Sequence, residues 1–417
     1  MRKKWHRRSL RIRDGLFGLV FAILFFLVGC GGSNDSFSSY LGLPITHDSM
    51  DEHLESKLEE MDIPGLAMAV VADGEVVYHF TGGYADKAQQ VKVDDATIFE
   101  GASMSKSLFA QFAMTFVEEG KLELDRPLHE YLPYPAIEHD ERYQKITARM
   151  ALSHRTGFPN WRWDRDDERL VIEFDPGTSY QYSGEGYQYL AEVLRHLADT
   201  DWEGLDALFI ERIAAPLGMT HTRFIPDEYA WEHKAEPYDE DGNWIDWPNH
   251  ADHIRNDGVF VAAASIHSEP LDFSKWMIGV MNKERLTPES YAELLRPHSA
   301  TGLDGPFDID YTLGFFRPQI PLTDLYLHGG NNHGFTCGYV LDMGRKWGFV
   351  VFTNSEYGEQ LAQELLSTLL LGPDGGKYLW AGGIVATLAA IMLLWVGYRF
   401  IGRFLRRRRE GTAAEGV

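Results

Sequence analysis

Cysteine is scarce in this chain of 417 residues, which contains only Cys30 and Cys337. Two cysteines cannot form a network of disulfides, so the composition excludes a small cross-linked scaffold. The chain also lacks a Gly-x-Ser-x-Gly elbow, a His-Glu-x-x-His motif and any internal repeat. Those absences exclude the commonest serine and zinc hydrolase designs and repeat architectures.

Basic residues are scarce in the middle of the chain. Without residues 1–14 and 399–417, 26 Lys and Arg residues stand against 59 Asp and Glu residues, a net charge of -33. Such a surface repels phosphate backbones and anionic lipids. We therefore predict no nucleic acid partner for the central domain.

Apolar residues are plentiful instead. Hydrophobic residues make up 44% of the chain and aromatic residues 13%. That content is sufficient for a large core, and the length suits one large domain or two intertwined ones.

The N-terminus has the pattern of an export signal. Seven Lys and Arg residues within residues 1–14 precede the apolar stretch Leu16–Val28. The junction Leu27-Val28-Gly29-Cys30 resembles a bacterial lipoprotein signal, which implies cleavage before Cys30 and lipidation of its thiol. An uncleaved signal anchor is the alternative. We predict a signal peptide with a lipobox over residues 1–30 and a tether over residues 31–48.

The C-terminal end carries a second membrane signal. Residues 378–398 are uncharged for 21 residues, and Arg406–Arg409 follow them. A helix of that length spans about 31 Å, enough to cross a bilayer. The positive-inside rule then makes residues 399–417 a basic cytoplasmic tail. We predict a protein of the bacterial cytoplasmic (inner) membrane, with its acidic domain on the periplasmic or extracellular side.

Between these ends, the pattern predicts an α/β (α+β) domain over residues 49–371. Met50–Met61 is amphipathic, and Leu66–Val71 and Glu75–Phe80 form a hairpin signal around Asp73-Gly74. Residues 125–297 are mostly helical and rich in loops. Further predicted elements are β runs at Thr312–Phe316, Leu325–Leu327, Gly334–Leu341 and Trp347–Thr353, and a helix at Glu359–Leu370. We expect one antiparallel sheet built from both termini, flanked by helices, plus a helical subdomain.

The one Ser-x-x-Lys sequence of the chain, Ser103 to Lys106, opens an apolar helix pattern that ends near Gly120. Residues i and i+3 share a helix face, so the two side chains can touch. A serine hydroxyl needs a neighbouring base before it becomes a good nucleophile, and a lysine with a lowered pKa can serve. This pair predicts nucleophilic catalysis.

Four segments carry a resemblance to a known family. They are Ala96–Pro133, Ile146–Phe158, Pro176–Leu190 and His328–Phe335. In order and spacing they resemble the serine β-lactamase and penicillin-binding-protein superfamily, in its class C, D-alanyl-D-alanine carboxypeptidase and esterase branch. The resemblance covers about residues 64–370 and implies a β-lactamase/transpeptidase-like fold.

The resemblance also implies roles. Ser103 is expected to be the nucleophile, Lys106 its base, and Tyr182 the residue that relays a proton to the leaving group. His328-Gly329-Gly330 stand where the family has Lys-Thr-Gly on the edge of the cleft. Backbone N–H groups of Ser103 and Asn331 are expected to form the oxyanion hole. Positive charge on Lys106 could hold Tyr182 as phenolate, or the reverse, and the sequence leaves both protonation states open.

Two departures bear on the substrate. The asparagine of the family's Tyr-x-Asn motif is Gly184 here, and its Lys-Thr-Gly lysine is His328. A histidine binds carboxylates less well than a lysine. The residues therefore favour a hydrolase of esters or amides, with peptidoglycan peptides among the candidates. A binding or sensor module without turnover, and a true β-lactamase, are the alternatives. The expected partners are a small-molecule or peptide substrate and the membrane.

Three other features receive structural interpretations. His154 lies in a loop that supports the site, and Cys337 is a small apolar residue within a strand pattern. The cluster of His250, Asp252 and His253 fits no zinc motif and is read as a solvated loop. No metal or cofactor is predicted.

Overall fold

The computed structural model describes residues 35–246, 258–303 and 306–373. The chain divides into two compact units, residues 1–50 with 365–417, and residues 51–364. The predictions for the signal peptide, Cys30, the spanning segment 378–398 and the basic tail lie outside the described residues. Within the described ranges, no helix is both long and apolar enough to cross a membrane.

The described part of the first unit contains a small antiparallel sheet. Strand β1 (Ser36–Ser38) pairs with β2 (Pro44–Thr46). Phe37 and Ile45 are buried, with 6% and 1% of their surfaces exposed. The segment predicted as a tether therefore includes regular secondary structure, in which these two apolar side chains are shielded from solvent.

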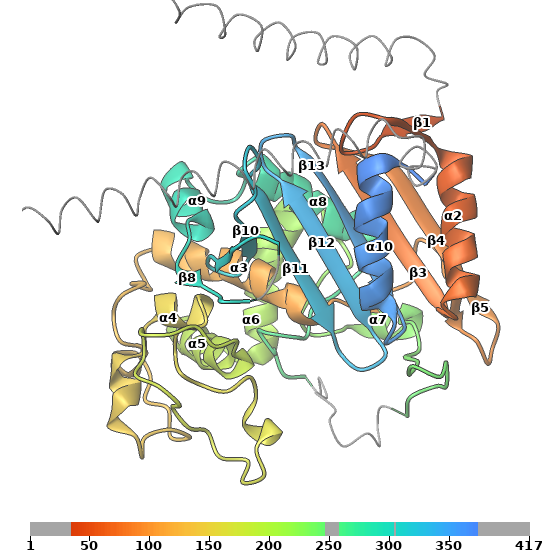
Figure 1. Ribbon diagram of the computed structural model, residues 1–417. Helices are drawn as coiled ribbons and strands as arrows, with labels where there is room; N and C mark the ends of the chain where they lie inside the picture. The colour runs from red at the N-terminus through yellow and green to blue at the C-terminus, as the bar shows by residue number, and fades with distance from the viewer. Residues whose placement is uncertain (1–34, 247–257, 304–305, 374–417) are drawn as a thin grey trace, which may run out of the picture. The chain divides into compact units, whose positions relative to one another are not determined.

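The second unit is built on a nine-stranded sheet (Figure 1), and every strand pairing in it is antiparallel. Strand β3 from the N-terminal third lies beside β13 from the C-terminal third, with Ala69 opposite Val350. The prediction of one sheet made from both ends is confirmed. The strands in spatial order are β5 (Val91–Lys92), β4 (Glu75–Asp86), β3 (Gly65–Ala72), β13 (Trp347–Thr353), β12 (Thr336–Asp342), β11 (Leu325–Asn331), β10 (Phe316–Pro318), β9 (Ile309–Tyr311) and β8 (Ser299–Ala300).

The β3–β4 hairpin forms where the sequence predicts it. Its turn residues Asp73 and Gly74 have φ angles of 54° and 81°. Two consecutive left-handed residues match the right-handed twist of the flanking strands. Glycine and aspartate tolerate that conformation, which is why the sequence signal was reliable.

One predicted β run is wrong. Thr312–Phe316 is mostly the turn between β9 and β10, with Gly314 at φ 91°. The hydroxyl of Ser107 donates to the Gly314 carbonyl at 2.5 Å, and a Cβ on Gly314 would lie 2.8 Å from the Lys106 carbonyl. Close packing against the helix that carries Lys106 therefore bends the chain here.

Helix α3 (Ser105–Glu118) is the centre of the core. Leu108, Phe109, Phe112 and Phe116 are all 0% exposed. Its rings pack on one another and on those of the helical region, with Phe112 against Phe116 at 5.4 Å between centroids. A helix that is apolar on several faces must be enclosed, so α3 holds the preceding residues rigidly between the sheet and the helical region (Figure 1).

Among the other α-helices of the described residues, four have 12 to 14 residues and four have 5 to 8. Helix α8 packs on strands β3, β4, β12 and β13. The longer helices are α2 (His47–Glu60), α5 (Gly184–Leu197), α8 (Pro270–Met281) and α10 (Gly358–Leu371), and the shorter ones are α4 (Ala148–Leu152), α6 (Trp202–Phe209), α7 (Glu228–His233) and α9 (Pro288–Leu295).

Candidate active site

Ser103 lies in a single 3-10 turn, η1 (Ala102–Met104), directly before α3. The residue before it, Ala102, is fully buried and has a φ of 41°. The hydroxyl of Ser105 donates to the Ala102 carbonyl at 2.5 Å and accepts the N–H of Ile266 at 2.9 Å. A left-handed alanine costs about 1 kcal/mol or more and persists only when its surroundings fix it. This strained turn orients the Ser103 side chain, and no pattern in the sequence predicts it.

Lys106 contacts Ser103 as predicted. Its Nζ donates to the Ser103 Oγ at 3.0 Å and to the Ala263 carbonyl at 2.9 Å. The side chain is 1% exposed, and burial lowers its pKa well below the usual range. Both of these partners are uncharged, so they do not compensate the cost of burying an ammonium. The geometry therefore favours a neutral amine that can accept a proton.

Tyr182 completes the group. The Lys106 Nζ lies 4.5 Å from the centroid of its ring. Burial raises the pKa of the Tyr182 phenol, and a hydrogen bond with the Ser103 hydroxyl lowers that pKa by less. The sequence left the resting proton unassigned between these two groups. The shifts of the two pKa values favour a neutral phenol beside a neutral amine, because burial penalises both charges.

His154 contributes more directly than the sequence indicated. It is fully buried, has a φ of 57°, and its ring packs 4.4 Å from that of Tyr182 between centroids. Its Nδ1 accepts the N–H of Ser183 at 3.0 Å. Burial is the main cause that lowers its pKa well below the usual range. His154 is thus a neutral side chain whose ring packs against the ring of Tyr182 and supports it.

His328 does not lie where the sequence interpretation placed it. Its side chain was expected to line the cleft, but it is 2% exposed and packs beside Tyr311, whose hydroxyl is 3.2 Å from its Nε2. Burial is the main cause that lowers its pKa to about 3. Side chains alternate along β11, and position 328 faces the core. A neutral, buried imidazole cannot offer positive charge to a substrate carboxylate.

The strand end beyond His328 approaches the nucleophile turn closely. A Cβ on Gly330 would lie 2.8 Å from the Gly101 carbonyl and 2.9 Å from the Ala102 Cβ. Gly329 has no such crowding, and Asn331 is exposed, with its amide donating to Glu356 at 3.1 Å. Glycine at 330 therefore lets β11 lie against the turn that carries Ser103.

These elements enclose a cleft of about 370 Å³. Of the predicted site residues, Ser103, Lys106 and Asn331 line it, whereas Tyr182, His328, Gly329 and Gly330 are not among its lining residues. The residues to which sequence reasoning gave no role in the site come from the segment between α4 and α5, from position 264, and from just beyond β11, inside the resembling segment His328–Phe335. They are Asn160, Trp161, Trp163, Asp164, Ala264, Asn332 and His333.

One wall of the cleft is held by a buried ion pair. Glu100 pairs with Lys234, and its other oxygen accepts the Asn332 amide at 2.7 Å. Burial alone would raise the pKa of Glu100, but Lys234 and the hydrogen bonds lower it further than burial raises it. Asn332 also donates to the Ala264 carbonyl at 3.1 Å. This network fixes the residues opposite Ser103.

Ser183, the residue directly after Tyr182, is held in place as the N-cap of α5. It caps α5: its hydroxyl accepts the Gly186 N–H at 3.1 Å and donates to the Pro159 carbonyl at 2.8 Å. Replacing Ser183 with alanine is expected to lower the free energy of unfolding by about 1 kcal/mol and to lower activity, because Tyr182 shifts with the cap. Urea unfolding and ester hydrolysis measure the two effects.

Asp201→Ala is the matched control. Asp201 caps α6, where its carboxylate accepts the Gly204 N–H at 2.8 Å, outside the cleft. Asp201→Ala should lower the free energy of unfolding by a similar amount but leave activity unchanged. Equal activity losses in both variants would contradict a role of the Ser183 cap in placing Tyr182.

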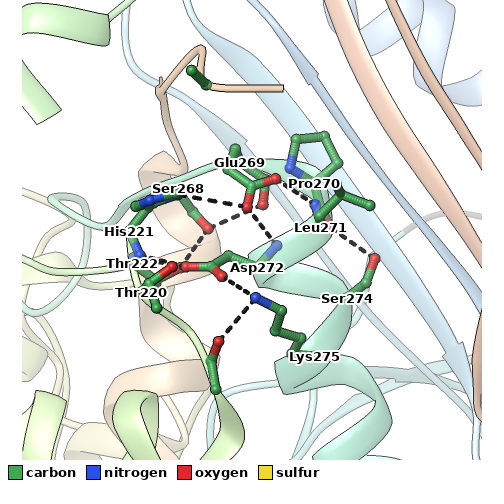
Figure 2. Close-up of polar contacts among 12 residues, drawn as sticks. Thr220, His221, Thr222, Ser268, Glu269, Pro270, Leu271, Asp272, Ser274 and Lys275 are labelled. Carbon is green, nitrogen blue, oxygen red and sulfur yellow. Dashed lines mark hydrogen bonds and ion pairs between the residues drawn. The ribbon is translucent and has the colours of Figure 1, made fainter. Parts of the chain in front are cut away.

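A group of His221, Glu269 and Asp272 has the residue types of a metal site (Figure 2), with one ligand atom of each within 4.8 Å of the others. Its carboxylates are already engaged. Glu269 accepts the N–H groups of Leu271 at 2.6 Å and of Asp272 at 2.8 Å. The carboxylate of Asp272 accepts hydrogen bonds from the backbone N–H of His221 at 2.6 Å and from the Lys275 ammonium at 2.7 Å. We interpret this group as the N-terminal cap of α8. The cluster at residues 250–253 lies outside the described residues.

Cys337 is buried, as predicted, and burial raises the pKa of its thiol well above the usual range. Its Sγ donates to the Gly101 carbonyl at 3.2 Å. The side chain therefore packs beneath the nucleophile turn as a small, protonated thiol.

Comparison with known proteins identifies the relatives of this arrangement. The sequence profile of the family described as Beta-lactamase matches residues 50–371. Protein flp of Staphylococcus aureus (strain NCTC 8325 / PS 47) is 23% identical over 354 residues, which are 77% of this chain and 66% of that protein. The chain thus spans just under two thirds of the length of that relative.

Two solved structures show the same fold. D-alanine carboxypeptidase AmpC from Burkholderia cenocepacia superposes with a TM-score of 0.63 at 20% identity, covering 78% of this chain and 98% of the other. EstCE1, described as a hydrolase with promiscuous acyltransferase activity, gives a TM-score of 0.63 at 19% identity over 75% of this chain and 95% of the other.

Proposed function

This chain belongs to the Beta-lactamase family, and we propose that it is a serine hydrolase of esters or amides that acts through an acyl-enzyme on Ser103. The observation that carries the proposal is the contact between Lys106 Nζ and Ser103 Oγ at 3.0 Å, in a buried site where burial lowers the pKa of the lysine. A neutral amine at hydrogen-bond distance is what a weak hydroxyl nucleophile requires.

The proposed first half-reaction uses three side chains. The Ser103 Oγ attacks the substrate carbonyl carbon while its proton passes to the neutral Lys106 amine. The Tyr182 phenol donates its proton to the leaving oxygen or nitrogen, and the lysine proton then restores the phenol. The carbonyl–heteroatom bond breaks, and the acyl group remains as an ester on Ser103. Water hydrolyses that ester by the same route in reverse.

Backbone donors are proposed to stabilise the oxyanion. The N–H groups of Ser103 and Asn331 are the candidates, since Gly330 brings β11 against the nucleophile turn. Donors of this kind typically contribute 10²–10³-fold to the rate of acyl transfer.

The substrate class is inferred from charge. A neutral His328 gives the site no cation for a carboxylate, which disfavours β-lactams and D-alanyl-D-alanine peptides. One solved structure of this fold is a D-alanine carboxypeptidase, which keeps peptidoglycan peptides among the candidates in spite of this charge argument. Esters and uncharged amides are therefore the proposed substrates, with peptidoglycan peptides the secondary candidates and a true β-lactamase disfavoured.

Intact-mass measurement tests the proposal. The full-length chain in detergent is incubated with a p-nitrophenyl ester and, separately, with penicillin, beside Ser103→Ala. An acyl adduct and p-nitrophenol release that both depend on Ser103 are expected with the ester, and little adduct with penicillin. A stable penicillin adduct would instead favour the peptidase candidates. Absence of turnover with both compounds would favour the binding module without catalysis.

We also propose that the chain is anchored in the cytoplasmic membrane by residues 378–398 and by lipid on Cys30, with its catalytic domain outside. The charge pattern at both ends supports this. Membranes washed with carbonate should retain the full chain and Cys30→Ser, and should release a Cys30→Ser chain that ends at Gly375. Retention of that last variant would indicate that residues 16–28 remain as an uncleaved signal anchor, whereas release of the full-length Cys30→Ser chain would contradict the C-terminal anchor.

A further inference from the structure

A neighbouring ring, not the backbone, requires glycine at position 184. Gly184 begins α5 and is not among the residues with positive φ. A Cβ there would lie 2.5 Å from Cζ2 and 2.6 Å from Cη2 of Trp161. The indole of Trp161 therefore occupies the volume that any side chain at 184 would need, beside Tyr182.

Trp161 is half of an aromatic pair that faces the nucleophile. Its ring stacks on Trp163 with 4.6 Å between centroids and 12° between planes. Both indoles line the same cleft as Ser103 and Lys106, and Trp163 is 45% exposed. The pair gives the cleft a flat apolar wall that is open to a ligand.

The loop that presents this pair is held in place. Arg162, between the two tryptophans, is not among the residues that line the cleft, and it donates to both oxygens of Glu185, at 2.7 and 2.6 Å. The backbone N–H of Trp161 donates to the carboxylate of Asp164 at 3.1 Å. Asn160 accepts the Gly184 N–H at 3.1 Å through its side chain. A wall fixed before binding loses little entropy when a ligand stacks on it.

The charges of the residues that line the cleft also favour an uncharged substrate. Among the described residues that line it, the one lysine or arginine is Lys106, which is buried and favoured as a neutral amine. Asp164 adds a carboxylate, and the ring of His333 lies 3.4 Å from Glu356. A substrate carboxylate at this wall would meet the carboxylate of Asp164 without an exposed lysine or arginine to compensate it.

We infer that the Trp161–Trp163 stack is a specificity element of the proposed hydrolase: it selects uncharged substrates with an aromatic group next to the scissile ester or amide, and it disfavours substrates with a carboxylate there. This inference rests on the proposed function of Ser103. Aromatic contacts of this kind correspond to a preference of roughly 3- to 10-fold in kcat/KM.

Thioesters with a small leaving group test it on the full-length chain in detergent. The S-ethyl thioesters of acetate, 3-phenylpropanoate and succinate are compared through the release of ethanethiol. Wild type should prefer the phenylpropanoyl over the acetyl substrate by roughly 3- to 10-fold, and should turn over the succinyl substrate most slowly. Trp163→Ala should reduce the phenylpropanoyl-to-acetyl ratio to about 1, and Trp163→Phe should retain most of it, since a phenyl ring still stacks.

Trp244→Ala is the matched control, because Trp244 is 53% exposed and lies outside this cleft. It should leave the ratio and both rates unchanged. Turnover that depends on Ser103 but shows the same ratio in wild type and Trp163→Ala would overturn this inference alone. Fastest turnover of the succinyl substrate would overturn it as well. Absence of Ser103-dependent turnover with all three thioesters would overturn the proposed function and this inference with it.

Discussion

Lys106→Met is expected to reduce kcat/KM for ester hydrolysis by about 10²–10⁴-fold, the usual contribution of a general base. Methionine has nearly the length of lysine and suits a buried position, so the α3 core should remain folded. The variant lacks only the amine that contacts the Ser103 Oγ at 3.0 Å and the Ala263 carbonyl at 2.9 Å. Initial rates with a p-nitrophenyl ester, together with far-UV circular dichroism, separate lost catalysis from lost folding.

The same variant tests the protonation state of Lys106. Burial lowers the pKa of this lysine in the folded chain, whereas the unfolded value is about 10.4. Between the two values the unfolded chain binds a proton that the folded chain does not, so stability rises with pH and is lost as pH falls. The slope is at most about 1.4 kcal/mol per pH unit. The difference in unfolding free energy between wild type and Lys106→Met should therefore increase from pH 7.5 to pH 9.5 in favour of wild type.

Lys145→Met provides the control, because Lys145 is 58% exposed and forms a surface ion pair with Asp175. It should show no such dependence on pH. A difference between wild type and Lys106→Met that stays constant over this range would mean that Lys106 is charged in the folded chain. Lys106 would then not serve as the resting base.

Gly330→Ala is expected to reduce activity by about 10²-fold or more, although it adds one methyl group. That Cβ would lie 2.8 Å from the Gly101 carbonyl, 2.8 Å from the Cys337 Sγ and 2.9 Å from the Ala102 Cβ. Either the strand end or the nucleophile turn must move. Displacement by about 1 Å at a catalytic site costs about 10²-fold. Rates with the same ester and urea unfolding record the loss.

Gly338→Ala is the matched substitution on the adjacent strand β12. A Cβ there has its nearest neighbour at 3.7 Å, an ordinary contact. Its activity should stay within about threefold of wild type, since no catalytic backbone has to shift. Similar losses in Gly330→Ala and Gly338→Ala would indicate that strand glycines matter here for general stability and not for the approach to Ser103.

The predictable part of the fold was set by local patterns. The Asp73-Gly74 turn, the apolar periodicity of α3 and the β runs near both ends each depend on neighbouring residues, and the structure confirms them. The run Thr312–Phe316 was misread because its composition suits a strand. Its bend is imposed by Ser107 and Ala110, about 200 positions earlier in the chain.

The Ser103–Lys106 contact was equally local, because the two residues are three positions apart where η1 leads into α3. By itself, the sequence also determined the family, through the order of its motifs. Whether these groups are charged depends on burial, and burial is a property of the assembled core. Only the tertiary structure therefore decided that Lys106, Tyr182 and His328 are favoured in their neutral forms.

Position 184 shows the same division most clearly. The sequence showed that an asparagine of the family motif is replaced by glycine, and it indicated a missing function. The structure shows that Trp161, 23 positions earlier, fills that space. No spacing rule links the two residues, because their contact arises when the loop before α5 folds over the start of that helix. The motifs identified the chemistry, and the packing of distant segments determined the shape of the cleft.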